Sequence, residues 1–169
     1  MISRKTRRTG RPLDRLIQRL YRLAFGLLKA YWFVARPHTR GANVAVWHGG
    51  RLLIVWNSYL KGYSLPGGFI RRNEPSSIAA ARELKEEVGI SVRPEDLTLA
   101  IEYATETNYH NSHTSVFEIE LDREPEIFID HREIVSAEFM RPKDLKTMKP
   151  QPALLPYFEA RLPPSATSD

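Results

Sequence analysis

The segment from residue 67 to residue 90 constrains the fold most, because both ends and one face of a helix can be identified in it. Pro75 suits a first helical position, Glu74 before it suits a cap, and Gly89 suits the left-handed residue past the end. Between these ends, apolar residues recur at intervals of three and four: Ala80, Ala81, Leu84 and Val88. Because small side chains allow close approach, the pattern predicts a helix of about four turns packed on a sheet.

Segments of strand character surround this helix. Apolar runs over residues 42–47 and 52–56 flank Gly49-Gly50, a pair that supplies the positive φ angles of a tight hairpin turn. Alternation predicts further strands over residues 97–104 (Leu99, Ile101 and Tyr103 on one face), 115–121 and 135–140. The remaining expected elements are a loop over 105–112, a short helix from Pro142 and a C-terminal helix over 154–161. Strands and helices in this order predict an α/β fold.

Three carboxylates gather on one face of the helix. Glu83, Glu86 and Glu87 stand at positions i, i+3 and i+4, which are neighbours on a helix surface. A solvated acidic face is one interpretation of such a cluster. A site for a divalent cation is the other, because three hard oxygen donors suit Mg²⁺ or Mn²⁺.

The full spacing of the segment decides between these interpretations. It runs Gly68, five residues, Glu74, seven residues, Arg82-Glu83-Leu84, one residue, Glu86-Glu87, one residue, Gly89-Ile90. This pattern resembles the Nudix box at every position that the box specifies, and the chain is identified as a member of the Nudix (MutT-like) hydrolase superfamily. The resemblance covers about residues 41–160 and implies a Nudix-type α/β/α sandwich around a mixed sheet.

The resemblance also implies an enzyme that hydrolyses a pyrophosphate linkage in a nucleoside diphosphate derivative, with Mg²⁺ or Mn²⁺ as cofactor. The residues that match the metal ligands are the carboxylates of Glu83, Glu86 and Glu87 and the backbone carbonyl of Gly67. Arg82 and Glu74 match a structural pair that holds the loop before the helix. The cations would offset the charge between glutamates and pyrophosphate and would activate the attacking water.

A general base is implied as well, either in the box or on a later loop. Glu133, just before the strand expected over 135–140, resembles the later position. Glu102 and Glu106 are alternative candidates, and a surface acid beside Arg132 is the other interpretation of Glu133.

The sequence does not select one substrate. ADP-ribose pyrophosphatases of the family carry a proline in a window that here holds Thr105 and Glu106, and dinucleoside polyphosphate hydrolases carry a tyrosine, for which Tyr109 lies just past the window. Tyr59, Tyr63 and Tyr109 are candidates to stack on a base, with packing in the core or at the rim as the alternative.

Two further pairs have a functional and a structural interpretation. Arg71 and Arg72 could contact phosphate or be solvated arginines. His110 and His113 have the spacing of metal ligands, but without further ligands they fit a polar loop better.

Residues 1–40 form a basic arm. They hold 11 Lys and Arg residues against one acid, Asp14, a net charge of +10, whereas the rest of the chain carries −5. Apolar residues recur at helical spacing from Leu13, with Pro12 at the start and Pro37 past the end, and predict an amphipathic helix over residues 12–35. We therefore divide the chain into an arm (1–40), a Nudix domain (41–162) and a disordered tail (163–169).

Three kinds of partner fit this helix. Its apolar stripe could pack on the domain or on a second copy of the chain, and its arginines and the cluster Tyr31-Trp32-Phe33 suit a membrane surface. Nucleic acid is the third, because a basic arm attracts phosphate. With no cysteine and no apolar run of about 18 residues, we expect a cytoplasmic protein, peripheral to a membrane if the helix binds one.

Two other functions compete with nucleotide hydrolysis. One is a non-catalytic Nudix-like module that binds nucleotides or regulates. The other is an RNA 5′-pyrophosphohydrolase whose basic arm holds the RNA.

Overall fold

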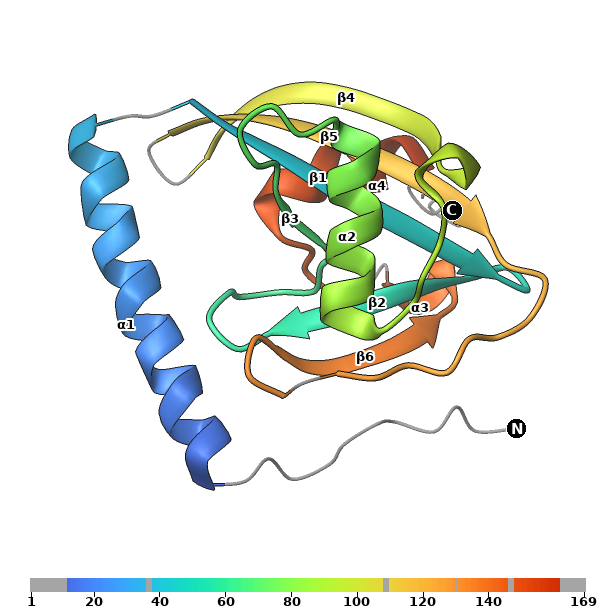
Figure 1. Cartoon of the computed structure of the whole chain (residues 1–169), viewed down its shortest axis with the longest axis horizontal. Helices are drawn as coiled ribbons and strands as arrows, with labels where there is room; N and C mark the ends of the chain where they lie inside the picture. Colours follow the sequence, from blue (N-terminus) through green and yellow to red (C-terminus); the bar gives the residue numbers. More distant parts are fainter. Residues whose placement is uncertain (1–11, 36–37, 108–109, 130, 146–147, 162–169) are drawn as a thin grey trace, which may run out of the picture.

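A mixed β-sheet lies at the centre of the structure, a computed structural model that describes residues 12–35, 38–107, 110–129, 131–145 and 148–161 (Figure 1). In these residues the six strands are ordered β4 (Thr98–Thr107), β5 (His110–Glu120), β1 (His38–His48), β2 (Arg51–Asn57) and β6 (Ile134–Met140), and β3 (Gly67–Phe69) pairs with β1 off this path. β1 and β5 run parallel, and the other pairs are antiparallel.

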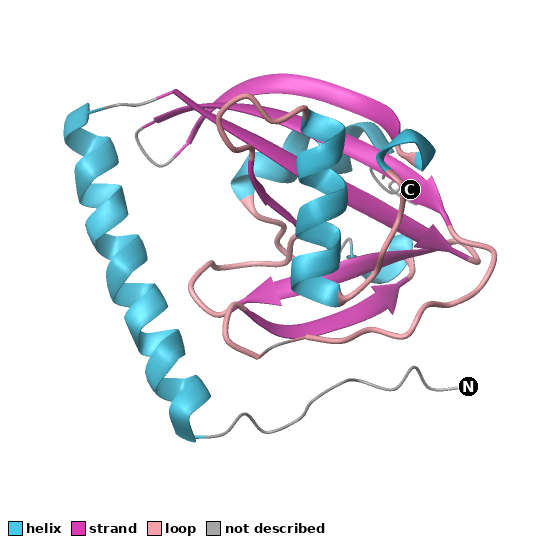
Figure 2. Ribbon diagram, viewed as in Figure 1, coloured by secondary structure: helices cyan, strands magenta, loops and turns pink. Residues whose placement is uncertain are grey.

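Helices cover both faces of this sheet (Figure 2). α2 (Ser76–Val88) packs on one face, and the short helices α3 (Pro142–Leu145) and α4 (Leu155–Arg161) pack on the other. 3₁₀ turns at Pro94–Asp96 and Pro152–Leu154 lie in the connections. α1 (Pro12–Ala35) lies beside the sheet rather than on one of its faces (Figure 1). The predicted α/β/α sandwich with an N-terminal helix is confirmed.

The two central strands are buried on both faces, which explains why they read as continuous apolar runs. Val44 and Val46 of β1 contact the core under α2, whereas Ala45 between them contacts the core under α4. β2 alternates in the same way, with Leu53 and Val55 on the α2 side and Leu52 and Ile54 on the α4 side. The hairpin between these strands is confirmed: Gly49 and Gly50 have φ of 54° and 69°, and His48 pairs with Arg51.

Two details of the β4–β5 hairpin differ from the prediction. The loop expected over 105–112 is wrong, because β4 continues to Thr107 and β5 begins at His110, with Thr105 paired to Ser112. The ladder extends because β5 pairs with β4 on one side from His110 and with β1 on the other side from Asn111. Leu99 does not share a face with Ile101 and Tyr103: a bulge between Leu99 and Ile101 shifts the register, so Leu99 is exposed.

The terminal helices lie close to their predicted bounds. α1 has the predicted bounds, and the C-terminal helix begins one residue later than predicted, after a 3₁₀ turn. The tail over 163–169 lies outside the described residues. Among the described helices, none combines the length and hydropathy that a membrane span requires.

Candidate active site

α2 is held against the sheet by small and aliphatic side chains. The predicted stripe of Ala80, Ala81, Leu84 and Val88 is buried, and Ala79, which was not predicted, is buried with it. Gly89 ends the helix with φ of 75°, as predicted. The predicted cap is wrong: Pro75 is the N-cap residue, no side chain caps the first turn, and the Glu74 carboxylate points elsewhere.

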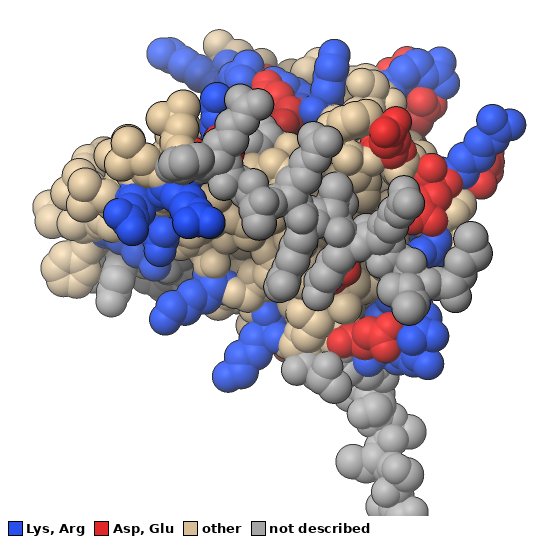
Figure 3. Space-filling view, turned by 90° about the horizontal axis from the view of Figure 1, so that it is seen from below, with Lys and Arg blue, Asp and Glu red and all other residues tan. Residues whose placement is uncertain are grey.

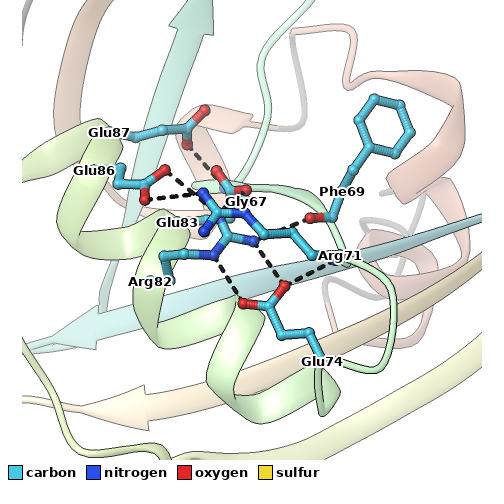
Figure 4. Close-up of polar contacts among 8 residues, drawn as sticks. All are labelled: Gly67, Phe69, Arg71, Glu74, Arg82, Glu83, Glu86 and Glu87. Carbon is cyan, nitrogen blue, oxygen red and sulfur yellow. Dashed lines mark hydrogen bonds and ion pairs between the residues drawn. The ribbon is translucent and has the colours of Figure 1, made fainter.

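Glu74 instead pairs with Arg82, as the resemblance implied. Arg82 Nε donates to Glu74 Oε1 at 2.9 Å and Nη2 donates to Oε2 at 3.0 Å, a two-point contact that Figure 4 shows. The backbone N–H of Arg71 also donates to Glu74, at 2.8 Å. These bonds, that from Arg82 first, hold the pKa of Glu74 down at about 2. The same pair raises the pKa of Arg82. Because Arg82 also donates to the Phe69 carbonyl, it ties the loop to α2.

Arg82 has a second role that the sequence did not reveal. Its Nη1 lies 2.5 Å from Glu83 Oε1 and 3.3 Å from Glu86 Oε2, so one guanidinium contacts three carboxylates (Figure 4). Arg71 adds an exposed contact to Glu86 at 3.5 Å. The separation of Arg82 and Glu86 by four residues could have signalled one of these contacts. Arg82 thus offsets part of the repulsion among the glutamates.

Glu83 and Glu87 lie deeper than Glu86. The Glu83 side chain is 16% exposed and that of Glu86 is 51% exposed. Burial raises the pKa of Glu83, and the charge of Glu86 adds to that effect. The buried Glu87 accepts the backbone N–H of Gly67 at 2.8 Å. A Cβ at Gly68 would lie 2.7 Å from the Glu83 carboxylate carbon, so the Glu83 side chain would have to move to admit it.

The three box glutamates are hard oxygen donors of the kind that bind a divalent cation. Their carboxylates also form contacts with other groups of the protein. Across the described residues, no three Asp, Glu or His side chains converge on a common point in the way that a metal site requires. The reason is visible in the contacts: Arg82 binds Glu83 and Glu86, and the Gly67 amide binds Glu87. The site nonetheless brings together hard oxygen donors in a partly buried position, which is what Mg²⁺ and Mn²⁺ need.

Glu133 is brought to this cluster by the fold. It is one of the charges that raise the pKa of Glu83, after burial and Glu86. Tyr59 donates its hydroxyl to Glu133 Oε1 at 2.5 Å, and the Ser58 amide donates to the Glu133 carbonyl at 2.7 Å. Burial first, and then Glu133, raise the pKa of Tyr59. The structure therefore links Glu133 to the box, and Tyr59 is an unforeseen partner of Glu133.

The alternative bases have different surroundings. Glu102 accepts a hydrogen bond from Ser115 at 2.6 Å on the β4–β5 ladder. The side chains of Glu106, Tyr109 and His110 lie outside the described residues.

The other residues that the sequence suggested for base stacking, phosphate binding or metal binding lie either in the core or on the surface. Tyr63 is buried in the core against Phe158 and cannot stack on a ligand. His113 is exposed on β5, and Arg71 and Arg72 are exposed before α2.

A pocket of about 160 Å³ opens beside Gly67 and Gly68. Its walls include the aromatic rings of Phe25, Tyr59 and Phe69 and the amides of Asn43, Asn57 and Gln151. Phe25 belongs to α1, a contribution that no local signal in the sequence indicated. A larger hollow of about 590 Å³ near Trp47 and Arg161 contains none of the box residues.

Comparison with known proteins agrees with this geometry. The family model of the NUDIX domain matches residues 37–159. A MutT protein from Methanosarcina mazei Go1 superposes with a TM-score of 0.64 at 19% identity, over 76% of this chain and 95% of the other. A search of curated proteins returned no match.

Two further structures are similar. An Ap4A hydrolase from C. elegans, in a binary complex, has a TM-score of 0.59 and 21% identity, over 73% of this chain and 97% of the other. A bifunctional NMN adenylyltransferase/ADP ribose pyrophosphatase from Francisella tularensis, complexed with AMP and a Mn ion, has a TM-score of 0.55 and 19% identity, over 72% of this chain and 40% of the other. At these identities the likeness shows the fold.

Proposed function

We propose that this chain, which belongs to the Nudix family and is a hydrolase, cleaves a pyrophosphate linkage in a nucleoside diphosphate derivative with the help of Mg²⁺ or Mn²⁺. One observation carries the proposal. The three box glutamates lie together on α2, beside a pocket that Gly67 and Gly68 help to line. The pocket adjoins the glutamates through these two glycines, because the Gly67 amide donates to Glu87 and Gly68 lies against the Glu83 carboxylate.

The cation would be held by Glu83, Glu86 and Glu87 and by the Gly67 carbonyl. When bound, it would neutralise substrate charge and lower the pKa of a water molecule. Arg82 keeps the loop in place through Glu74, and this contact does not use the carboxylates that the cation needs. Release of Glu83 and Glu86 from Arg82 would leave the Arg82–Glu74 pair intact.

Glu133 is our candidate to accept the proton of the attacking water. Its position next to the box supports this role, because its charge acts on Glu83. Tyr59 is a positioning residue for it, since its hydroxyl donates to Glu133 Oε1 and directs that oxygen. The Ser58 amide, which donates to the Glu133 carbonyl, fixes the backbone of the same residue.

The pocket walls support a nucleoside as part of the substrate. Aromatic rings stack on bases, and amides can donate to and accept from the edge of a base. Gln151 Nε2 donates to Asn57 Oδ1 at 3.0 Å, which orients both amides. Two similar structures are, by name, an Ap4A hydrolase and a protein complexed with AMP and a Mn ion. We further propose a cytoplasmic location for the reaction.

A screen of nucleoside diphosphate derivatives with Mg²⁺ or Mn²⁺, measuring released monophosphate or phosphate, tests the proposal. We expect turnover of at least one compound, abolished by a chelator. Nucleotide binding without turnover across the screen would favour the non-catalytic module. 5′-Triphosphorylated RNA is tested beside the screen, and turnover of this RNA alone, lost steeply with salt, would favour the RNA 5′-pyrophosphohydrolase.

A further inference from the structure

α1 has two chemically different faces, and contacts with the domain fix which one points outward. On the inner face, Gln18 Nε2 donates to the His131 carbonyl at 2.7 Å. Tyr21 stacks on the ring of Tyr59 with centroids 6.0 Å apart, and Phe25 packs on the same ring at 5.0 Å. These residues follow one another at intervals of three and four positions, so they mark one side of the helix.

The outer face is a stripe of exposed leucines. Five of them follow one another at intervals of three and four, and each is between 54% and 66% exposed: Leu13, Leu16, Leu20, Leu23 and Leu27. We call these residues the leucine stripe. A continuous apolar surface of this kind on a folded chain marks an interaction site.

Cations border the leucine stripe. Arg19 lies next to it, three positions from Leu16 and four from Leu23. Arg15 and Arg22 lie further round on the same side of the helix. Figure 3 shows Lys and Arg atoms beside uncharged atoms at the left, where α1 lies, and the acidic atoms visible in that view lie away from this end. In the part of the chain that the structure describes, neither Arg15 nor Arg19 forms an ion pair.

We infer that the leucine stripe docks on an anionic lipid surface. An apolar face bordered by arginines is the pattern of a helix that lies in the plane of a membrane interface, with leucines among the acyl chains and arginines at the headgroups. α1 would lie on the bilayer and not cross it, in keeping with its hydropathy. The domain would stay attached through the opposite face of the helix.

Charge favours lipid over a second copy of the chain. Intervals of three and four also suit a coiled coil, so spacing alone does not decide. The only acid in residues 1–40 is Asp14, and the arm carries a net +10. Two arms packed side by side would repel each other, with no acidic residue near the leucine stripe to pair with the arginines. Anionic headgroups would neutralise the same charges.

Co-sedimentation of the full-length protein with vesicles tests the inference. The vesicles are phosphatidylcholine alone or phosphatidylcholine mixed with phosphatidylglycerol. Two double variants probe the stripe and its border: Leu20→Gln with Leu23→Gln, and Arg15→Gln with Arg19→Gln. The matched control is Leu99→Gln with Leu155→Gln, two leucines of 49% and 40% exposure on β4 and α4. Because all six side chains are on the surface, melting temperatures should stay close to that of the native chain.

We expect binding to the anionic vesicles, and a loss of more than about tenfold in each α1 variant but not in the control. High salt should weaken binding. Equal binding to both vesicle types, or equal binding by native chain and α1 variants, would overturn the inference. So would the absence of vesicle binding together with a dimer in ultracentrifugation that the Leu20/Leu23 variant dissociates, since a second copy would then cover the stripe. None of these measurements depends on the proposed hydrolysis.

Discussion

The two long helices of this chain use their apolar residues in opposite ways. α2, with 13 residues, buries its apolar stripe against the sheet and turns its glutamates toward Arg82 and Gly67. α1, with 24 residues, leaves its leucines exposed and contacts the domain through a few polar and aromatic side chains. α2 is therefore held by packing on one face and by the contacts of its charged residues beside it, whereas α1 has one apolar face that stays exposed.

This difference predicts which of the two helices should tolerate substitutions without loss of activity. On α2 the polar residues are tied to one another and to the loop, so the loss of one group disturbs several others. On the outer face of α1 each leucine is more than half exposed, so its loss should leave folding and hydrolysis intact. Matched substitutions on the two helices can test this contrast.

The largest effect should come from the box glutamates. Glu86→Gln and Glu87→Gln each remove a charged oxygen without changing side-chain size, and we expect turnover to fall at least about a hundredfold with the fold retained. Steady-state kinetics and circular dichroism measure both properties. Leu20→Gln on α1 serves as the control, with native turnover expected. If both glutamine variants kept more than a tenth of the native rate, the assignment of these residues would be wrong.

A smaller effect, on both activity and melting temperature, is expected for Arg82→Ala. The variant leaves Glu74 and Glu83 without their guanidinium partner, so it should lose activity and melt roughly 5 °C lower at neutral pH. Arg19→Ala is the matched control, because Arg19 is an exposed helix residue of the same type. Equal melting temperatures for Arg82→Ala and the native chain would show that the pair does not stabilise the loop.

The Arg82 effect should also depend on pH. Pairing lowers the pKa of Glu74 from 4.5 to about 2, so its contribution is complete above about pH 4.5 and is lost as the pH falls toward 2. The difference in melting temperature between native chain and variant should therefore shrink over that window. A difference that stays constant down to pH 2 would place the stabilisation elsewhere, for instance in the Arg82 bond to the Phe69 carbonyl.

The smallest effect concerns the point where α1 reaches the site. Tyr59→Phe keeps the ring that Tyr21 and Phe25 contact and removes only the hydroxyl that donates to Glu133. We expect kcat to fall several-fold with KM and melting temperature nearly unchanged, because Glu133 would be less well oriented. Tyr63→Phe, which changes a buried tyrosine of the core, is the control for loss of a hydroxyl. An unchanged kcat for Tyr59→Phe would show that the Tyr59 hydroxyl does not position Glu133.

Local sequence signals determined much of this protein. The hairpin at Gly49-Gly50, the end of α2 at Gly89 and the bounds of α1 follow from residue types and their periodicity. The spacing of the box predicted the Arg82–Glu74 pair and the family. These features depend on residues within a few turns of one another, where backbone preference and side-chain spacing act directly.

Tertiary structure decided the rest. The bulge that exposes Leu99 depends on the neighbouring strand, and the contact of Tyr59 with Glu133 joins residues 74 positions apart. The sequence showed an apolar stripe on α1 but not which part of it would face the domain. That choice was made by Tyr59 and His131, which offer a ring and a carbonyl to one side of the helix and leave the leucines outside. Contacts between distant segments depend on how the sheet brings them together. The periodicity within one segment does not predict such contacts.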